Sequence, residues 1–272
     1  MWATLALSAA LTVAPAQGGN LTLKNPRPTY GILGQDRKDK DTVLVGDVFT
    51  LAFDIDGLQT KEDGAVQYSV GMELFDSAGK SQFKQEPKDL EAVNSLGGNS
   101  MPAFALIEIR TDTKPGDYKL KVTVTDRLAK ATKELTYPFK VAPPTLGFVQ
   151  CNLAYPDQGY RPAPPVAAAG QTYWVNFAVV GFDLEKTKMQ PQFSVEMRVL
   201  DAAGKPTLSK PATGGVDGLK SPVDDAFKKI LPFQFALQLN RAGRYTIELK
   251  VTDKVSGKSA TQTMDFTVVE TK

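Results

Sequence analysis

The sequence predicts an all-β protein made of two tandem antiparallel β-sandwiches without disulfide bonds. Three observations predict this fold class. Apolar residues recur at every second position in several segments, which is the spacing of half-buried strands. Segments of the first half return in the same order in the second half; residues 115–126, for example, return as residues 242–253. The chain of 272 residues has one cysteine, Cys151, which excludes an internal disulfide bond.

The N-terminal residues 2–13 form an uncharged apolar run, and Ala14-Pro15-Ala16 follows it. A short apolar run that ends in small residues is typical of a secretory signal peptide. It is too short for a membrane span, which takes about 20 apolar residues. We therefore expect residues 1–16 to be removed and the protein to be extracytoplasmic, either periplasmic or secreted, with no transmembrane segment. The alternative is that the run is a strand or buried helix of the mature protein.

Composition excludes several functions. The net charge of +2 gives no field that would favour nucleic acid. The chain has no histidine, which excludes Ser-His-Asp and Cys-His catalysis and histidine-ligated zinc. We expect no enzyme activity, no cofactor and no metal site. We expect Cys151 to be a buried apolar side chain on the first strand of the second domain.

The first domain is predicted over residues 20–142. Residues 46–57 and 68–76 alternate apolar and polar side chains, and a turn follows at residues 76–80. Leu90 and Val93, at helical spacing, predict one short helical turn within the polar segment 81–100. Strands are expected again near residues 104–109, 118–125 and 137–141.

Adjacent prolines in residues 143–145 predict a short, stiff linker. The second domain is predicted over residues 146–270. Its residues 170–181 match 46–57 without a gap, and residues 193–205 match 68–80. A short helix is expected over residues 221–230, with Pro222 near its first position.

A turn, a tyrosine and an alternating strand recur in both halves. The motif residues are Gly116, Tyr118, Gly243 and Tyr245. This motif resembles the tyrosine corner of bacterial immunoglobulin-like and fibronectin type III-like tandem sandwiches, over roughly residues 20–270. The resemblance implies that each tyrosine hydroxyl bonds to upstream backbone. Leu120 and Ile247 stand where antibody-type domains place a cysteine, so the resemblance is to the disulfide-free class and transfers no activity.

Two sets of side chains are candidates for binding. The candidate interaction surface consists of Trp174, Tyr155, Tyr160 and Arg161. The last three belong to an aromatic, proline-rich loop, which is either a recognition surface or a rigid hinge that packs against the first domain. Trp174 is expected on the outward face of its strand, where it contacts a partner, a sugar or the other domain, or is covered by residues 206–230. The carboxylates Asp54, Asp56 and Asp126 suit calcium chemically, but the second repeat has Ala178 and Val180 in place of the first two. We interpret these carboxylates as solvated surface.

These observations predict a monomeric, non-catalytic binding or scaffold protein that engages a protein or cell-envelope component. A periplasmic chaperone-like protein with an open strand edge and a carbohydrate-binding module are the alternatives. A metal-dependent enzyme that uses carboxylates alone is the most distant one.

Overall fold

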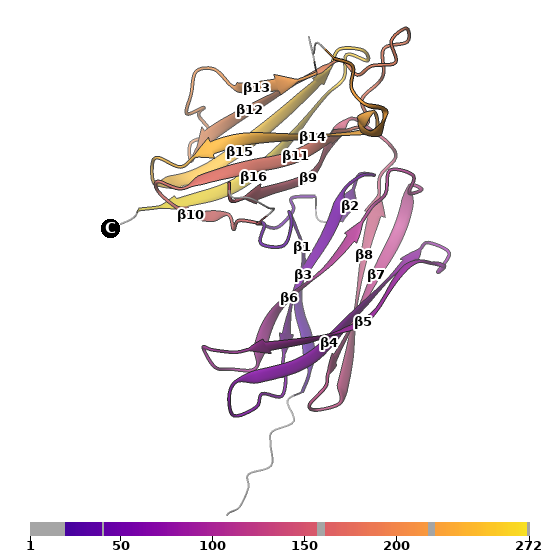
Figure 1. Cartoon of the computed structure of the whole chain (residues 1–272), viewed down its shortest axis with the longest axis vertical. Helices are drawn as coiled ribbons and strands as arrows, with labels where there is room; N and C mark the ends of the chain where they lie inside the picture. Colours follow the sequence, from indigo (N-terminus) through magenta and orange to yellow (C-terminus); the bar gives the residue numbers. More distant parts are fainter. Residues whose placement is uncertain (1–19, 40, 157–160, 217–220, 271–272) are drawn as a thin grey trace, which may run out of the picture.

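The computed structural model describes residues 20–39, 41–156, 161–216 and 221–270 (Figure 1). The predicted signal peptide and Tyr160 lie outside these residues. The described chain contains sixteen strands and one short 3-10 helix, which confirms the prediction of an all-β protein. Within the described ranges, no helix is long and apolar enough to cross a membrane.

The strands of the first half form two sheets. One has the order β1-β3-β6 and the other the order β2-β8-β7-β4-β5. Strand β2 pairs with β8 in parallel, and the other pairs are antiparallel. The strands are β1 (Thr22–Thr29), β2 (Thr42–Val43), β3 (Val48–Asp56), β4 (Ala65–Asp76), β5 (Ser81–Val93), β6 (Ser100–Glu108), β7 (Gly116–Asp126) and β8 (Ala131–Val141).

The second half has the same arrangement, strand for strand. Its sheets have the orders β14-β11-β9 and β10-β16-β15-β12-β13, and β10 again pairs with β16 in parallel. The elements are β9 (Gly147–Ala154), β10 (Val166–Ala168), β11 (Thr172–Val180), β12 (Phe193–Asp201), β13 (Ala212–Gly215), η1 (Asp225–Phe227), β14 (Ile230–Gln238), β15 (Gly243–Asp253) and β16 (Ser259–Val269). The sequence repeat therefore corresponds to a repeat of topology.

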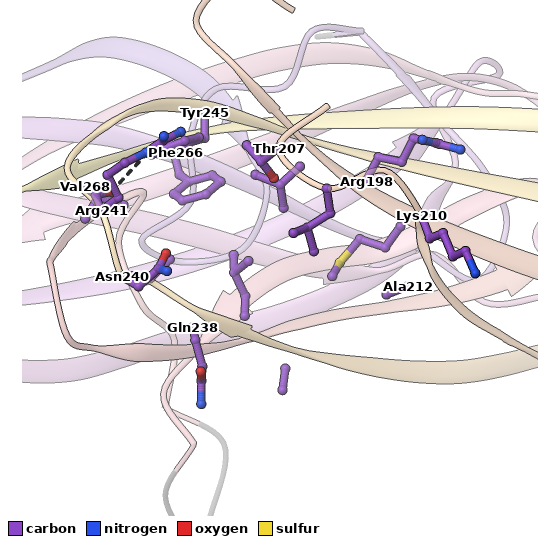
Figure 2. Close-up of a pocket in the computed structure, with 16 residues that line it drawn as sticks. Arg198, Thr207, Lys210, Ala212, Gln238, Asn240, Arg241, Tyr245, Phe266 and Val268 are labelled. Carbon is purple, nitrogen blue, oxygen red and sulfur yellow. Dashed lines mark hydrogen bonds between the residues drawn. The ribbon is translucent and has the colours of Figure 1, made fainter. Parts of the chain in front are cut away.

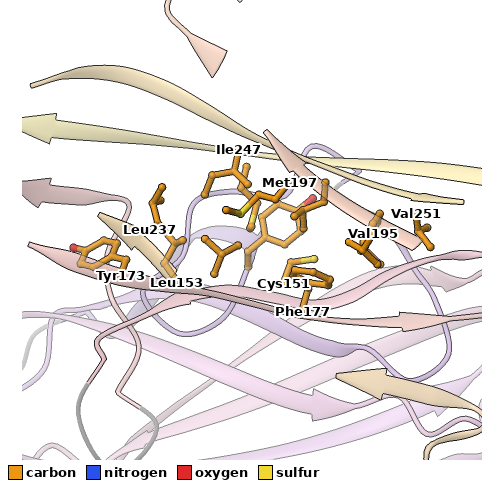
Figure 3. Close-up of a cluster of buried hydrophobic side chains, with 14 of the residues drawn as sticks. Cys151, Leu153, Tyr173, Phe177, Val195, Met197, Leu237, Ile247 and Val251 are labelled. Atoms are coloured by element: carbon orange, nitrogen blue, oxygen red, sulfur yellow. The ribbon is translucent and has the colours of Figure 1, made fainter. Parts of the chain in front are cut away.

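Each half has its own apolar core between its two sheets. In β7, Leu120, Val122 and Val124 are fully buried, and the residues between them are partly exposed. The corresponding cluster of the second half contains Cys151 on β9 (Figure 3). Burial raises the pKa of the Cys151 thiol, so this side chain acts as an apolar core residue, as the sequence predicts.

The first helix prediction is wrong, and the second is confirmed for three residues only. Leu90 lies in β5, opposite Tyr68 on β4, and not in a helical turn. Pairing along the whole of β4 outweighs the weak helical spacing of two apolar residues. Near residues 221–230, the helix is limited to η1, and β14 begins at Ile230.

The two halves meet through loops of the first half. Tyr30 belongs to the core cluster of the second half, and Gln262 Nε2 donates to its hydroxyl at 2.6 Å. The guanidinium carbon of Arg37 lies 5.1 Å from the centre of the Tyr30 ring. Arg37 also forms a buried ion pair with Asp47.

Asp47 connects that ion pair to the second half. Its Oδ1 accepts the backbone N–H of Gln150 at 2.8 Å, and Gln150 Nε2 donates to Gly46 O at 2.8 Å. Gln150 has φ 55° and lies where the pairing of β9 with β11 shifts register. Such a bulge re-aims a residue away from its own sheet, and here Gln150 binds the first half.

Candidate binding surfaces

Trp174 lies on β11, the middle strand of the three-stranded sheet, and its side chain is partly exposed. Tyr173 and Val175, its neighbours in sequence, point into the core and are fully buried. The residues directly beside Trp174 on the adjacent strands are Ala154 and Ala236. Because alanine ends at Cβ, neither neighbour covers the indole ring.

A row of three amide side chains lies next to Trp174 on the same face. Gln234 Nε2 donates to Asn176 Oδ1 at 2.9 Å, and Asn176 Nδ2 donates to Asn152 Oδ1 at 3.1 Å. Asn152 Nδ2 in turn donates to Gln150 O at 2.8 Å. The three amides come from β14, β11 and β9. We call Asn152, Asn176 and Gln234 the amide row.

The amide row and Trp174 line one shallow hollow of about 630 Å³. Tyr155 also lines it. No charged side chain is among the described residues of its lining. The hollow therefore presents an aromatic ring and groups that can both donate and accept hydrogen bonds, without a net charge.

The candidate surface from the sequence is only partly assembled. Tyr155 and Trp174 line the same hollow, but Arg161 does not line it. The Arg161 guanidinium lies over the Tyr155 ring at 5.1 Å, and Tyr155 packs edge-on against Tyr173 at 5.4 Å between ring centres. Burial, followed by the neighbouring Tyr155, raises the pKa of Tyr173. Arg161 and Tyr155 thus contact each other just after β9, and Arg161 is directed at the Tyr155 ring and not at the hollow.

Part of the outward face of β11 is covered, by the first half and by Ile230, the last residue of the segment 206–230 that we expected as the cover. Ala178 and Val180 are buried in a cluster with Val149, and Leu44 of the first half packs against it. Residues 206–216 lie instead beside β12 in the opposite sheet, where β13 pairs with Ser194 to Met197. The part of the outward face of β11 at Ala178 and Val180 is therefore a contact between the halves, and the side chain of Trp174, at the other end, stays partly exposed.

A second hollow, of about 600 Å³, opens at the side of the second half between β14 and β12 (Figure 2). We call it the edge groove. Its floor is apolar and includes Met197, Leu237, Leu239, Phe266 and Val268. Figure 2 shows Arg198 and Lys210 at one end and Arg241 beside Tyr245 at the other.

The tyrosine motifs bond to upstream backbone in both halves. The Tyr118 hydroxyl donates to Lys114 O at 2.8 Å, and the Tyr245 hydroxyl donates to Arg241 O at 3.1 Å. Gly243 has φ 151°, and a Cβ there would lie 3.1 to 3.2 Å from the Tyr245 side chain. The positive φ therefore favours glycine, and a side chain there would also crowd the ring that packs over it.

The carboxylates considered for calcium are bound to other protein groups. Asp54 accepts from Asn25 at 2.8 Å, and Asp56 pairs with Lys24 at 2.8 Å. The interpretation as solvated surface is wrong for Asp126, which is buried and accepts the backbone N–H of Gln59 at 2.6 Å. In the part of the chain that the structure describes, no group of three or more acidic, cysteine or histidine side chains is placed to hold a metal ion.

No protein-family model and no curated protein matches the chain. Among solved structures, a red sea bream transglutaminase aligns with 94% of this chain at 11% identity and a TM-score of 0.29, and the alignment covers 31% of the transglutaminase. The C-terminal domain of the Streptococcus pyogenes antigen I/II-family protein AspA aligns with 91% of this chain and 99% of that domain, at 10% identity and a TM-score of 0.29. TM-scores of this size do not establish a shared fold.

Proposed function

We propose that this chain is a non-catalytic, extracytoplasmic binding protein. Its Trp174 face, which consists of Trp174, Tyr155 and the amide row, binds a neutral polysaccharide of the cell envelope. The binding unit is the second of two immunoglobulin-like sandwiches, residues 20–142 and 146–270, joined by residues 143–145. The protein acts as a monomer. The N-terminal apolar run of residues 2–13 supports the extracytoplasmic location.

The observation that carries the proposal is the amide row beside a partly exposed indole ring. The C–H face of a sugar ring packs against an aromatic ring, and its hydroxyl groups exchange hydrogen bonds with side-chain amides. Each amide of the row uses one hydrogen of its NH₂ group within the row or to Gln150 O. The second hydrogen of each amide is left for a ligand.

Charge selects the class of sugar. In a chain with 23% charged residues, the described lining of the hollow contains none. A sulfated or uronic acid-rich glycan would lose hydration there and gain no opposite charge. A neutral glycan loses no ionic hydration and finds both donors and acceptors.

The same lining argues against catalysis. Glycoside hydrolysis uses two carboxyl groups on either side of the bond that breaks. The hollow has no carboxylate among its described lining residues, and the chain has no histidine to act as a general base. The face is suited to hold a glycan and not to cleave it.

A glycan array tests the proposal. The full chain is applied to neutral polysaccharides and to sulfated and uronic acid-containing ones, with Trp174→Ala in parallel. We expect retention on one or more neutral polysaccharides and loss of that retention in the variant. Preference for charged glycans, or equal retention of the variant, would contradict the proposal.

A further inference from the structure

We infer that the edge groove, a site separate from the Trp174 face, binds an extended, acidic segment of a partner protein, which adds as a strand to the free edge of β14. The inference rests on the unpaired strand, the apolar floor and the charge of the rim.

Strand β14 is an unprotected edge. It is the last strand of its sheet, and the described residues place no strand on its outer side. Its nine residues, Ile230–Gln238, include no charged side chain. Exposed edges are usually blocked by charges, and an edge without them is a template for another strand. Pro232 has no N–H, so the segment able to pair begins at Phe233.

The opposite wall of the groove is incomplete. In the first half, the long strand β5 runs beside β4 over most of its length. In the second half, β13 pairs with only four residues of β12. Thr207 N donates to Val199 O at 2.9 Å, and the chain then leaves the sheet until Ala212. Leu208, in that excursion, is 73% exposed.

A strand added in the gap beside β12 would face apolar side chains. In the apolar floor, Leu237 and Leu239 come from β14 and the residues just after it, and Met197 and Phe266 come from β12 and β16 of the other sheet. In a strand laid along β14, every second side chain would point between the sheets toward this floor. The backbone edge supplies the hydrogen bonds of strand addition, and the floor selects alternating apolar residues.

Charge identifies the segment as acidic. The charged residues that line the groove are Arg198, Lys210 and Arg241, and none of the described lining residues is Asp or Glu. Asp201, whose Oδ1 accepts the backbone N–H groups of Ala203 and Lys205 at 3.0 Å, lies near Arg241 and offsets part of its charge, so Arg198 and Lys210 supply most of the positive excess. The rim thus complements carboxylates on the incoming segment.

The corresponding hollow of the first half differs and provides an internal control. It is lined by Asp76, Glu108, Asp112 and Asp117 together with Lys80, Arg110 and Lys114. Arg110 and Asp112 pair with each other at 3.0 Å. This hollow has no excess of positive charge and does not select an acidic strand.

Two labelled peptides test the inference on the full chain. Each has about eight alternating valine and threonine residues; one ends in glutamates and the other in lysines. We expect the acidic peptide to bind at least about tenfold more tightly by fluorescence anisotropy, with binding weakened as NaCl rises from about 0.05 M to about 0.5 M. Hydrogen exchange of backbone amides in residues 233–238 should slow when the peptide binds.

Matched charge reversals complete the test. Arg198→Glu/Lys210→Glu is expected to reduce acidic-peptide affinity by about tenfold or more, whereas Lys80→Glu/Lys114→Glu in the first half leaves it unchanged. Equal binding of both peptides, or binding without slower exchange in β14, would overturn the inference. Binding of oleate at the groove with no binding of either peptide would also overturn it and would identify a lipid site instead.

Discussion

Asn176 and Asn152, on the adjacent strands β11 and β9, share a hydrogen bond of 3.1 Å between their side-chain amides. Asn176 also accepts from Gln234, so it is held from both sides. An amide fixed in this way loses little further conformational freedom when a ligand binds. The amide row is therefore already organised for the glycan binding that we propose.

Asn176→Ala removes the middle member of the row. We expect a loss of about tenfold in glycan affinity, or about 1.4 kcal/mol, because Gln234 and Asn152 each lose a hydrogen bond that orients them and one donor is gone. Isothermal titration calorimetry with the glycan from the array measures the change. Gln238→Ala is the matched control, because Gln238 is an exposed amide on β14 that does not line the hollow beside Trp174. An equal loss in both variants would contradict a specific role for the row.

Tyr118→Phe and Tyr245→Phe keep the packed rings and remove the hydroxyl groups. Tyr118 is buried with a bond of 2.8 Å, so we expect a loss of about 1 to 2 kcal/mol of unfolding free energy. Tyr245 is partly exposed with longer bonds of 3.1 and 3.3 Å, so we expect about 0.5 to 1 kcal/mol. Urea unfolding measures both. Unchanged stability in the two variants would show that these tyrosines serve only as core aromatics.

The strand pattern and the turns of this fold could be predicted from the sequence, because they depend on local spacing. Alternation in residues 46–57 and 170–181 marked β3 and β11. The Asp-x-x-Gly turn after β4 forms as expected, with Gly79 at φ 76°. The strand over residues 81–93 was not predicted, because its apolar residues are few and it forms through pairing with β4.

The binding surfaces could be predicted only in part, because they depend on register. The outward position of Trp174 follows from the alternation of its own strand. The amide row joins residues 152, 176 and 234, and only the pairing of β9, β11 and β14 brings them together. The contact between the two halves could not be predicted for a similar reason, since Tyr30 and Gln262 are far apart in the chain.

Arg37→Met tests the buried ion pair between Arg37 and Asp47, where the two halves meet. The variant leaves the Asp47 carboxylate buried without its cation, and we expect a loss of about 3 to 5 kcal/mol of unfolding free energy. Adding Asp47→Asn removes the unpaired charge and keeps an oxygen that can accept from Gln150. The double variant should therefore recover part of that loss. A double variant less stable than Arg37→Met, in the same urea experiment, would contradict this account.

Asp253 links the stability of the second half to pH. Burial alone would raise its pKa, but hydrogen bonds from the Ser256 hydroxyl and from backbone N–H groups, including that of Asp183, lower it overall. Because the folded-state pKa lies below the unfolded value of about 3.9, the stabilisation is present above about pH 4 and is lost as pH falls through the folded-state pKa.

Unfolding free energies measured between about pH 6 and pH 3 test this linkage. Asp253→Asn should lower stability by about 1 to 3 kcal/mol at pH 6 and flatten the decline in acid. An unaltered acid decline in Asp253→Asn would show that other carboxylates set it.

The fluorescence of Trp174 tests the central claim most directly. The chain has two tryptophans, Trp2 and Trp174, and removal of the predicted signal peptide, residues 1–16, leaves Trp174 as the sole indole emitter. On titration with the neutral glycan, we expect its emission to shift to shorter wavelength as the sugar displaces water. The shift should saturate with the dissociation constant that calorimetry gives. Emission that stays unchanged while calorimetry records binding would place the glycan elsewhere and contradict the assignment of the Trp174 face.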